Sequence, residues 1–132
     1  MIINVKNGSM INSNMVNVHD FILENFTFNR QINELVLTLF DEENNLQHIM
    51  RFAGVIGFEI SACNYWGKSP YILDFEYVEP GDQKIVGKLF AKNKKGYHPF
   101  CELKDISGYL ETMFTFTSGD QLCIACESVQ ID

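Results

Sequence analysis

Long hydrophobic runs are absent from this sequence, and none approaches the roughly 18 residues of a membrane-spanning helix. The stretch Met1–Lys6 has too few apolar residues for a secretory signal. Basic side chains are also scarce, because 10 Lys and Arg stand against 17 Asp and Glu and leave a formal net charge of −7. That charge repels a phosphate backbone. We therefore expect a cytoplasmic protein that binds neither membranes nor nucleic acids.

Cysteine occurs only four times, in a chain large enough to fold without a disulfide framework. Cys123-Ile-Ala-Cys126, with His98-Pro-Phe-Cys101 upstream, imitates the ligand spacing of a zinc site. The surrounding residues alternate as in a strand, which points the sulfurs of Cys123 and Cys126 to opposite faces with Cα atoms roughly 10 Å apart. We therefore predict that these two cysteines and the remaining pair, Cys63 and Cys101, are reduced thiols, and that the protein holds no metal and no cofactor.

Catalytic motifs are absent as well, since the sequence has no G-x-S-x-G, no glycine-rich phosphate loop and no thiol-protease pattern. The pair His19-Asp20 matches part of a metal set in a helical phosphohydrolase family, but the further His and Asp ligands are missing. A hydrogen bond from the imidazole to a neighbouring backbone group is the favoured interpretation. We predict a protein that is not an enzyme, with a metal-dependent hydrolase as the weaker reading.

What the sequence does contain is a strong sheet signal. Aromatic residues make up 13% of the chain and accompany many Val, Ile and Thr, which suit a pleated, half-buried surface. From Phe21 onward, apolar segments of strand length recur about every ten residues between turn signals. This rhythm predicts one domain over residues 1–132, an antiparallel β-sandwich or flattened barrel of about ten short strands with at most one short helix. Residues 1–20 are Asn-rich and predict a loosely attached arm or hairpin.

Three polar turns predict three hairpins. Their arms are Glu34–Asp41 with Gln47–Phe52, Tyr71–Glu79 with Lys84–Lys92, and Thr112–Thr117 with Gln121–Ile131. In the second hairpin, Asp74 and Glu76 would face the lysines of the return arm across the strands. Gly54 predicts a bend, and Leu103–Glu111 is the one stretch expected to be helical. The candidate core residues are Leu37, Leu39, Ile56, Phe58, Ile60, Phe114, Phe116, Leu122 and Ile124.

The most informative segment for function is the probable loop from Asn64 to Tyr71, which contains the only Trp. Aromatic side chains of this kind dominate interface hot spots and also stack on sugars. The alternative is that the Trp packs back over the edge of the sandwich. Acidic residues of neighbouring strands would place a negative patch beside this loop, which suits a basic partner. The candidate binding residues are Tyr65, Trp66, Tyr71, Glu59, Asp74 and Glu76.

The pattern of His19-Asp20, Arg51-Phe-Ala-Gly-Val55 leading into Phe58, and Phe114-Thr-Phe-Thr-Ser-Gly-Asp-Gln-Leu-Cys-Ile124 resembles a loose group of small bacterial β-rich proteins. Many of these are uncharacterised, and some are regarded as immunity-type proteins that neutralise a toxin encoded alongside. The resemblance, the net negative charge and the pair Tyr65-Trp66 together predict an intracellular binding protein of the immunity type that inhibits a basic toxin. The resemblance assigns no functional residue. The alternative function is a small-ligand or carbohydrate-binding sandwich that uses the aromatic loop. Nothing in the sequence selects an oligomeric state.

Overall fold

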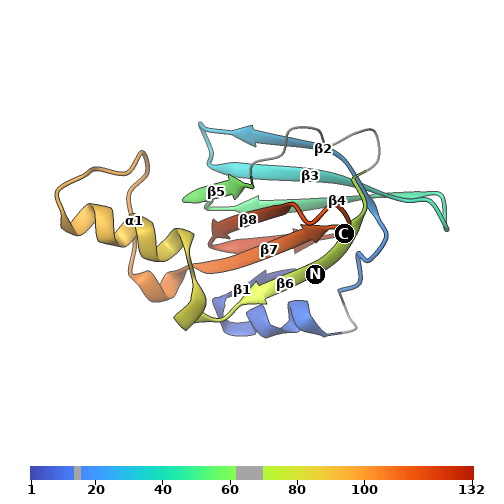
Figure 1. The fold of residues 1–132 in the computed structure, drawn as a ribbon. Coiled ribbons are helices and arrows are strands. Elements are labelled where there is room, and N and C mark those ends of the chain that lie inside the picture. The colour runs from blue at the N-terminus through green and yellow to red at the C-terminus, as the bar shows by residue number, and fades with distance from the viewer. Residues whose placement is uncertain (14–15, 62–69) are drawn as a thin grey trace.

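The computed structural model describes residues 1–13, 16–61 and 70–132, and nine strands in these ranges form two antiparallel sheets (Figure 1). Sheet A has the strand order β1-β9-β4-β3-β2, and sheet B has the order β5-β8-β7-β6. The strands are β1 (Ile2–Asn4), β2 (Ile22–Asn29), β3 (Glu34–Asp41), β4 (Leu46–Ala53), β5 (Gly57–Ile60), β6 (Ile72–Val78), β7 (Leu110–Phe116), β8 (Gln121–Cys126) and β9 (Ser128–Ile131). The helical elements are η1 (Val5–Asn12), η2 (Pro80–Asp82) and η3 (Ile106–Gly108), all 3-10, and the α-helix α1 (Ile85–Lys94). The all-β prediction is confirmed, and of the two predicted architectures the sandwich is the one found.

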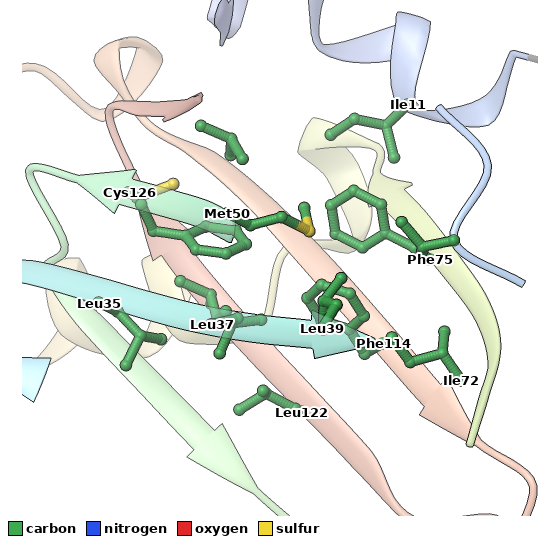
Figure 2. Packing of buried hydrophobic residues seen from close by; sticks show 14 of the residues in the cluster. Ile11, Leu35, Leu37, Leu39, Met50, Ile72, Phe75, Phe114, Leu122 and Cys126 are labelled. Carbon is green, nitrogen blue, oxygen red and sulfur yellow. The ribbon is translucent and has the colours of Figure 1, made fainter. Parts of the chain in front are cut away.

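The core lies between the two sheets and follows from strict alternation along the strands (Figure 2). On β3, Leu35, Leu37 and Leu39 are buried, while the residues between them are only half-buried. Six core predictions are confirmed, namely Leu37, Leu39, Phe114, Phe116, Leu122 and Ile124. Ile56 and Phe58 are half-buried and pack at the edges of the core. Ile60 was predicted wrongly: its side chain is 37% exposed because it ends the short edge strand β5.

The first and third predicted hairpins are present as β3–β4 and β7–β8. The return arm of the third hairpin is not one strand, because β8 belongs to sheet B and β9 to sheet A. The change of sheet occurs at Glu127, whose N–H donates to the carbonyl oxygen of Ala53 at 3.0 Å. The predicted bend at Gly54 is confirmed by its φ of +62°, and there the chain likewise passes from sheet A to sheet B. The two crossings therefore lie next to each other.

The second predicted hairpin is wrong in its return arm, since Lys84–Lys92 folds as α1 and not as a strand. Ile85, Val86 and Leu89 lie on the helix face that packs against the outer side of sheet B. No helix spans Leu103–Glu111, where the structure has the 3-10 turn η3 and the start of β7. The described helices include none that is both long enough and apolar enough to cross a membrane.

The N-terminal segment is neither a loose arm nor a hairpin in its described residues. β1 pairs with β9 at the edge of sheet A, with Ile3 opposite Val129. Ile3, Ile11 and Val18 are all buried in the main core. The sequence pattern here is weak because the segment contributes single apolar anchors and no alternating run.

Close contact between α1 and sheet B depends on the glycine that begins β5. A Cβ atom at Gly57 would lie 2.9 Å from Cγ2 of Ile85 and 3.4 Å from Cδ1 of Leu89. The first distance is shorter than side chains tolerate, so any larger residue must push the helix outward. Gly87, within the helix, has no atom within 4 Å of an added Cβ.

These two glycines give a matched pair of predictions. We expect Gly57→Ala to lower the free energy of unfolding by about 1–2 kcal/mol, because the added methyl group overpacks the interface with α1. We expect Gly87→Ala to raise it by about 0.5–1 kcal/mol, because alanine is the better helix former in open space. Urea denaturation of both variants measures the difference. Equal effects of the same sign would contradict the proposed close contact.

Candidate functional site

Two of the six predicted binding residues, Tyr65 and Trp66, lie outside the described residues. Three hypotheses depend on these two residues and stay predictions: an aromatic binding loop, a carbohydrate-stacking platform, and a plug over the sandwich edge. Tyr71 is described, and its hydroxyl group donates a 2.7 Å hydrogen bond to Oε1 of Glu42. This bond raises the pKa of Tyr71. It also ties the start of β6 to the turn that joins β3 and β4.

Asp74 and Glu76 lie together on β6, the edge strand of sheet B. A hydrogen bond with Asp74 raises the pKa of the Glu76 carboxyl group, and partial burial and the negative charge of Asp74 act in the same direction. The N-terminal segment runs beside this edge and satisfies part of it: the Asn12 side-chain oxygen accepts from the Tyr77 N–H at 3.0 Å. Between that segment and β6 is a cleft of about 380 Å³, which we call the edge cleft.

A second cleft, of about 650 Å³, adjoins the first and is called here the turn cleft. It lies where the β3–β4 turn meets the start of β2 and the start of β6. Asn17 and His19 line both clefts, so the two are adjacent. No Lys or Arg is found among the described residues that line either one. We define the acidic surface as the carboxylates that line the two clefts together with the adjoining tyrosine. Its members are Asp20, Asp41, Glu42, Glu43, Tyr71, Asp74 and Glu76.

Asp41 shapes the turn that carries two of these carboxylates. Its Oδ1 accepts from the backbone N–H groups of Glu43 and Asn44 at 3.1 and 3.3 Å, and its Oδ2 accepts from the Asn44 side chain at 2.7 Å. These bonds favour the charged form and lower the pKa of Asp41, with the Asn44 side chain making the largest contribution. Asp41 is therefore a turn-forming residue, and Glu42 and Glu43 are the groups it presents.

Glu59 is not part of this surface. It lies on β5, at the opposite edge of sheet B from β6. Its Oε1 is 3.1 Å from Nζ of Lys88 on α1, so the charge of Glu59 is paired. The structure thus brings Tyr71, Asp74 and Glu76 to one side of the molecule and leaves Glu59 on the other. Sequence reasoning missed Asp20, Glu42 and Glu43, because only the meeting of three separate strand ends places them beside β6.

His19 behaves as the sequence predicted. Its Nδ1 is 2.7 Å from the carbonyl oxygen of Leu73, a backbone contact that fixes the ring against the start of β6. The Nε2 atom lies 3.4 Å from Oδ2 of Asp20. In residues 1–13, 16–61 and 70–132, no group of three or more His, Cys, Asp or Glu is placed to hold a metal ion.

The cysteines of the CxxC motif point to opposite faces of sheet B, as predicted. Cys126 is in the main core between the sheets, whereas Cys123 packs in the cluster beneath α1. Burial raises the pKa of both thiols, most strongly that of Cys126. A buried thiol of this kind is a poor nucleophile at neutral pH.

A third hollow, the apolar groove, was not anticipated from the sequence. It has a volume of about 940 Å³ and lies between β5, the β2–β3 turn, α1 and the segment that follows α1. Its walls include the rings of Phe28, Phe58 and Phe100 and the aliphatic side chain of Leu89. Its signal in the sequence is the aromatic stretch Tyr97-His-Pro-Phe100, which overlaps the zinc-like spacing of His98-Pro-Phe-Cys101.

Comparison with known proteins adds no family to these observations. No protein-family model matches the chain, and no curated protein matches it.

Proposed function

We propose that this protein is a non-enzymatic binding protein and that its acidic surface docks a basic protein partner. The observation that carries the proposal is the pair of adjacent clefts lined by carboxylates, with no Lys or Arg among their described lining residues. Complementary charge steers a basic partner toward such a surface and fixes its orientation there.

The carboxyl pair on β6 supports the proposal energetically. Asp74 and Glu76 are close enough to share a hydrogen bond, and none of the ion pairs found in the described ranges involves either of them. The hydrogen bond with Asp74 is the main cause of the raised pKa of Glu76, and burial and the repulsion between the two carboxylates when both are ionised raise it further. A Lys or Arg side chain from a partner removes this repulsion. The carboxyl pair therefore gains more binding free energy from a bound cation than two isolated carboxylates would.

Tyr71 supplies a rigid contact beside these charges. Its hydroxyl group is held by Glu42, so little side-chain freedom remains to be lost on binding. An aromatic ring next to carboxylates suits a guanidinium group, which can stack on the ring and bond to the acid. Tyrosine in such a position is a typical interface hot spot.

The specific form of the proposal is an inhibitor that covers the active site of a basic toxin. Its support is the resemblance of the sequence pattern to immunity-type proteins, together with the acidic surface. An inhibitor of this kind needs no catalytic group of its own, and it gains speed of association from opposite charge.

The test compares two variants that remove the same charge from different places. Asp74→Asn with Glu76→Gln neutralises the carboxyl pair, and Glu24→Gln with Glu102→Gln neutralises two exposed carboxylates outside both clefts. The wild type and the Glu24/Glu102 variant should capture the same basic protein, in fixed ratio, from a lysate of the source organism. We expect the Asp74/Glu76 variant to bind the purified partner at least about tenfold more weakly by calorimetry.

The same calorimetric titration has a pH signature. Protonation of Glu76 removes negative charge from the free surface, so affinity should fall as the pH drops through the raised pKa of Glu76. That pH dependence should be smaller in the Asp74/Glu76 variant. Equal affinity of both charge variants, or a partner that carries no basic patch, would refute the proposal.

A further inference from the structure

The apolar groove lies at the other end of the sandwich from the β3–β4 turn, which carries Glu42 and Glu43. Figure 1 shows α1 and the chain after it projecting at one end, while the β3–β4 turn projects at the opposite end. The groove lies at the α1 end, between α1, the start of β5 and the β2–β3 turn. It is therefore a separate site, and an inference about it does not rest on the proposed function.

The walls of the groove are apolar and partly preformed. Phe28 and Phe58 meet edge to face, with ring centroids 5.1 Å apart, and Val55 is buried beside them. Leu89 of α1 also lines the groove. On the outer rim, the Phe100 side chain is fully exposed to solvent. An exposed Phe beside a concave apolar wall is unfavourable in water and favourable in contact with an apolar ligand.

The charged groups of the groove are all cationic. Arg30 and Lys92 line it, and no Asp or Glu is among its described lining residues. Neither Arg30 nor Lys92 takes part in an ion pair with the described residues. Three other cations do have carboxylate partners: Arg51 pairs with Glu34, Lys88 with Glu59 and Lys104 with Glu127. Lys6, Lys84, Lys94 and Lys95 are likewise outside these ion pairs, so the distinguishing feature of Arg30 and Lys92 is their place at an apolar groove that has no carboxylate among its described lining residues.

We propose that this groove binds a small amphipathic carboxylate. The apolar body of the ligand packs between Phe58 and Leu89 and beneath Phe100, and its carboxylate is bound at the rim by Arg30 and Lys92. The volume of about 940 Å³ is within the range of small-molecule sites. The apolar walls provide most of the affinity, and the two cations select the sign of the head group.

The first experiment varies only the head group of the ligand. Dodecanoate, dodecyltrimethylammonium and dodecanol have the same chain and differ in charge, and each is titrated into the wild-type protein by calorimetry below its aggregation concentration. We expect saturable 1:1 binding of dodecanoate and binding of dodecyltrimethylammonium at least about tenfold weaker. Equal binding of the two charged ligands, or no saturable binding of dodecanoate, would overturn the proposal.

The second experiment locates the site with two variants of equal net charge. Arg30→Gln with Lys92→Gln removes both rim cations, and Lys94→Gln with Lys95→Gln removes two exposed lysines at the end of the same helix that do not line the groove. We expect the first variant to bind dodecanoate at least about tenfold more weakly and the second to change by less than about twofold. Equal loss in both variants would show a general charge effect and refute the site.

Phe100→Ala provides a check that is independent of charge. Because its side chain is fully exposed, its removal should leave thermal stability unchanged. The substitution should lower the affinity for dodecanoate several-fold. It should leave intact the preference for the carboxylate over the quaternary ammonium ligand. Unchanged affinity in this variant would contradict the placement of the apolar body beneath the ring.

Discussion

Replacing Glu111 by alanine is expected to lower the free energy of unfolding by about 3 kcal/mol. Glu111 lies on β7 and is only 1% exposed. Its Oε1 accepts hydrogen bonds from the backbone N–H groups of Ile85 and Val86 at 2.9 and 3.1 Å, and its Oε2 accepts from that of Lys84 at 2.9 Å. One carboxylate thus satisfies three of the donors that open the first turn of α1.

The magnitude follows from what the alanine variant leaves behind. Lys84, at the N-cap position of α1, makes no side-chain capping bond, so Glu111 supplies the cap from another element. Without it, three buried or half-buried N–H groups lose their partner, and the favourable charge at the positive end of the helix is lost too. Glu111→Gln should lose less, because its amide oxygen still accepts from two of the donors.

Urea denaturation of Glu111→Ala, Glu111→Gln and Glu79→Ala measures this effect. Glu79 precedes η2, is exposed and makes no capping bond, so its removal should change stability by less than about 0.5 kcal/mol. A loss of helical circular dichroism should accompany the Glu111→Ala variant if α1 detaches from the sheet. Similar losses for Glu79→Ala and Glu111→Ala would show that the buried carboxylate has no special role.

The sheets were predictable because their signals are local. The alternation around Leu37 and the polar turn after Asp41 occupy one short stretch of sequence, and so do the strands on either side of Gly119. When every second residue of a strand is apolar, only one face of that strand can point into the core. The same local logic separated Cys123 from Cys126 and excluded a shared metal site for them.

The helix α1 was missed because its pattern is ambiguous and its cap is distant in sequence. Lys84, Lys88 and Lys92 share a face in a strand and also lie close together on a helix, so their spacing decides nothing. The apolar residues Ile85, Val86 and Leu89 favour a helix, but a short segment with a lysine at the N-cap lacks a local start signal. The capping carboxylate is 25 to 27 residues away and cannot be recognised without the fold.

The candidate sites share this limit. Sequence reasoning found Tyr71, Asp74 and Glu76 but grouped them with Glu59, which the strand order sends to the far edge of sheet B. Six of the ten Lys and Arg residues lie within residues 84–104, and α1 carries much of this charge to the end of the molecule opposite the β3–β4 turn. A net charge of −7 therefore conceals two regions of opposite charge, the acidic surface and the lysine-rich end around α1. Their separation becomes visible only when the helix is placed.

Phe114→Ala is expected to have the largest effect on stability, a loss of about 4 kcal/mol. Phe114 is completely buried at the middle of β7, and Figure 2 shows it among core side chains from both sheets. Its ring stacks on that of Phe75 with centroids 4.3 Å apart and meets Phe52 edge to face at 6.3 Å.

Removing this ring leaves a cavity in a region where the strands on either side are fixed by their ladders, so the walls cannot collapse to fill it. Phe114→Leu should lose markedly less, because most of the volume stays filled. Phe100→Ala deletes the same atoms from a fully exposed position and should leave the unfolding midpoint in urea unchanged. If Phe114→Ala were as stable as Phe100→Ala, the two sheets would not be packed through Phe114, and the sandwich arrangement itself would have to be revised.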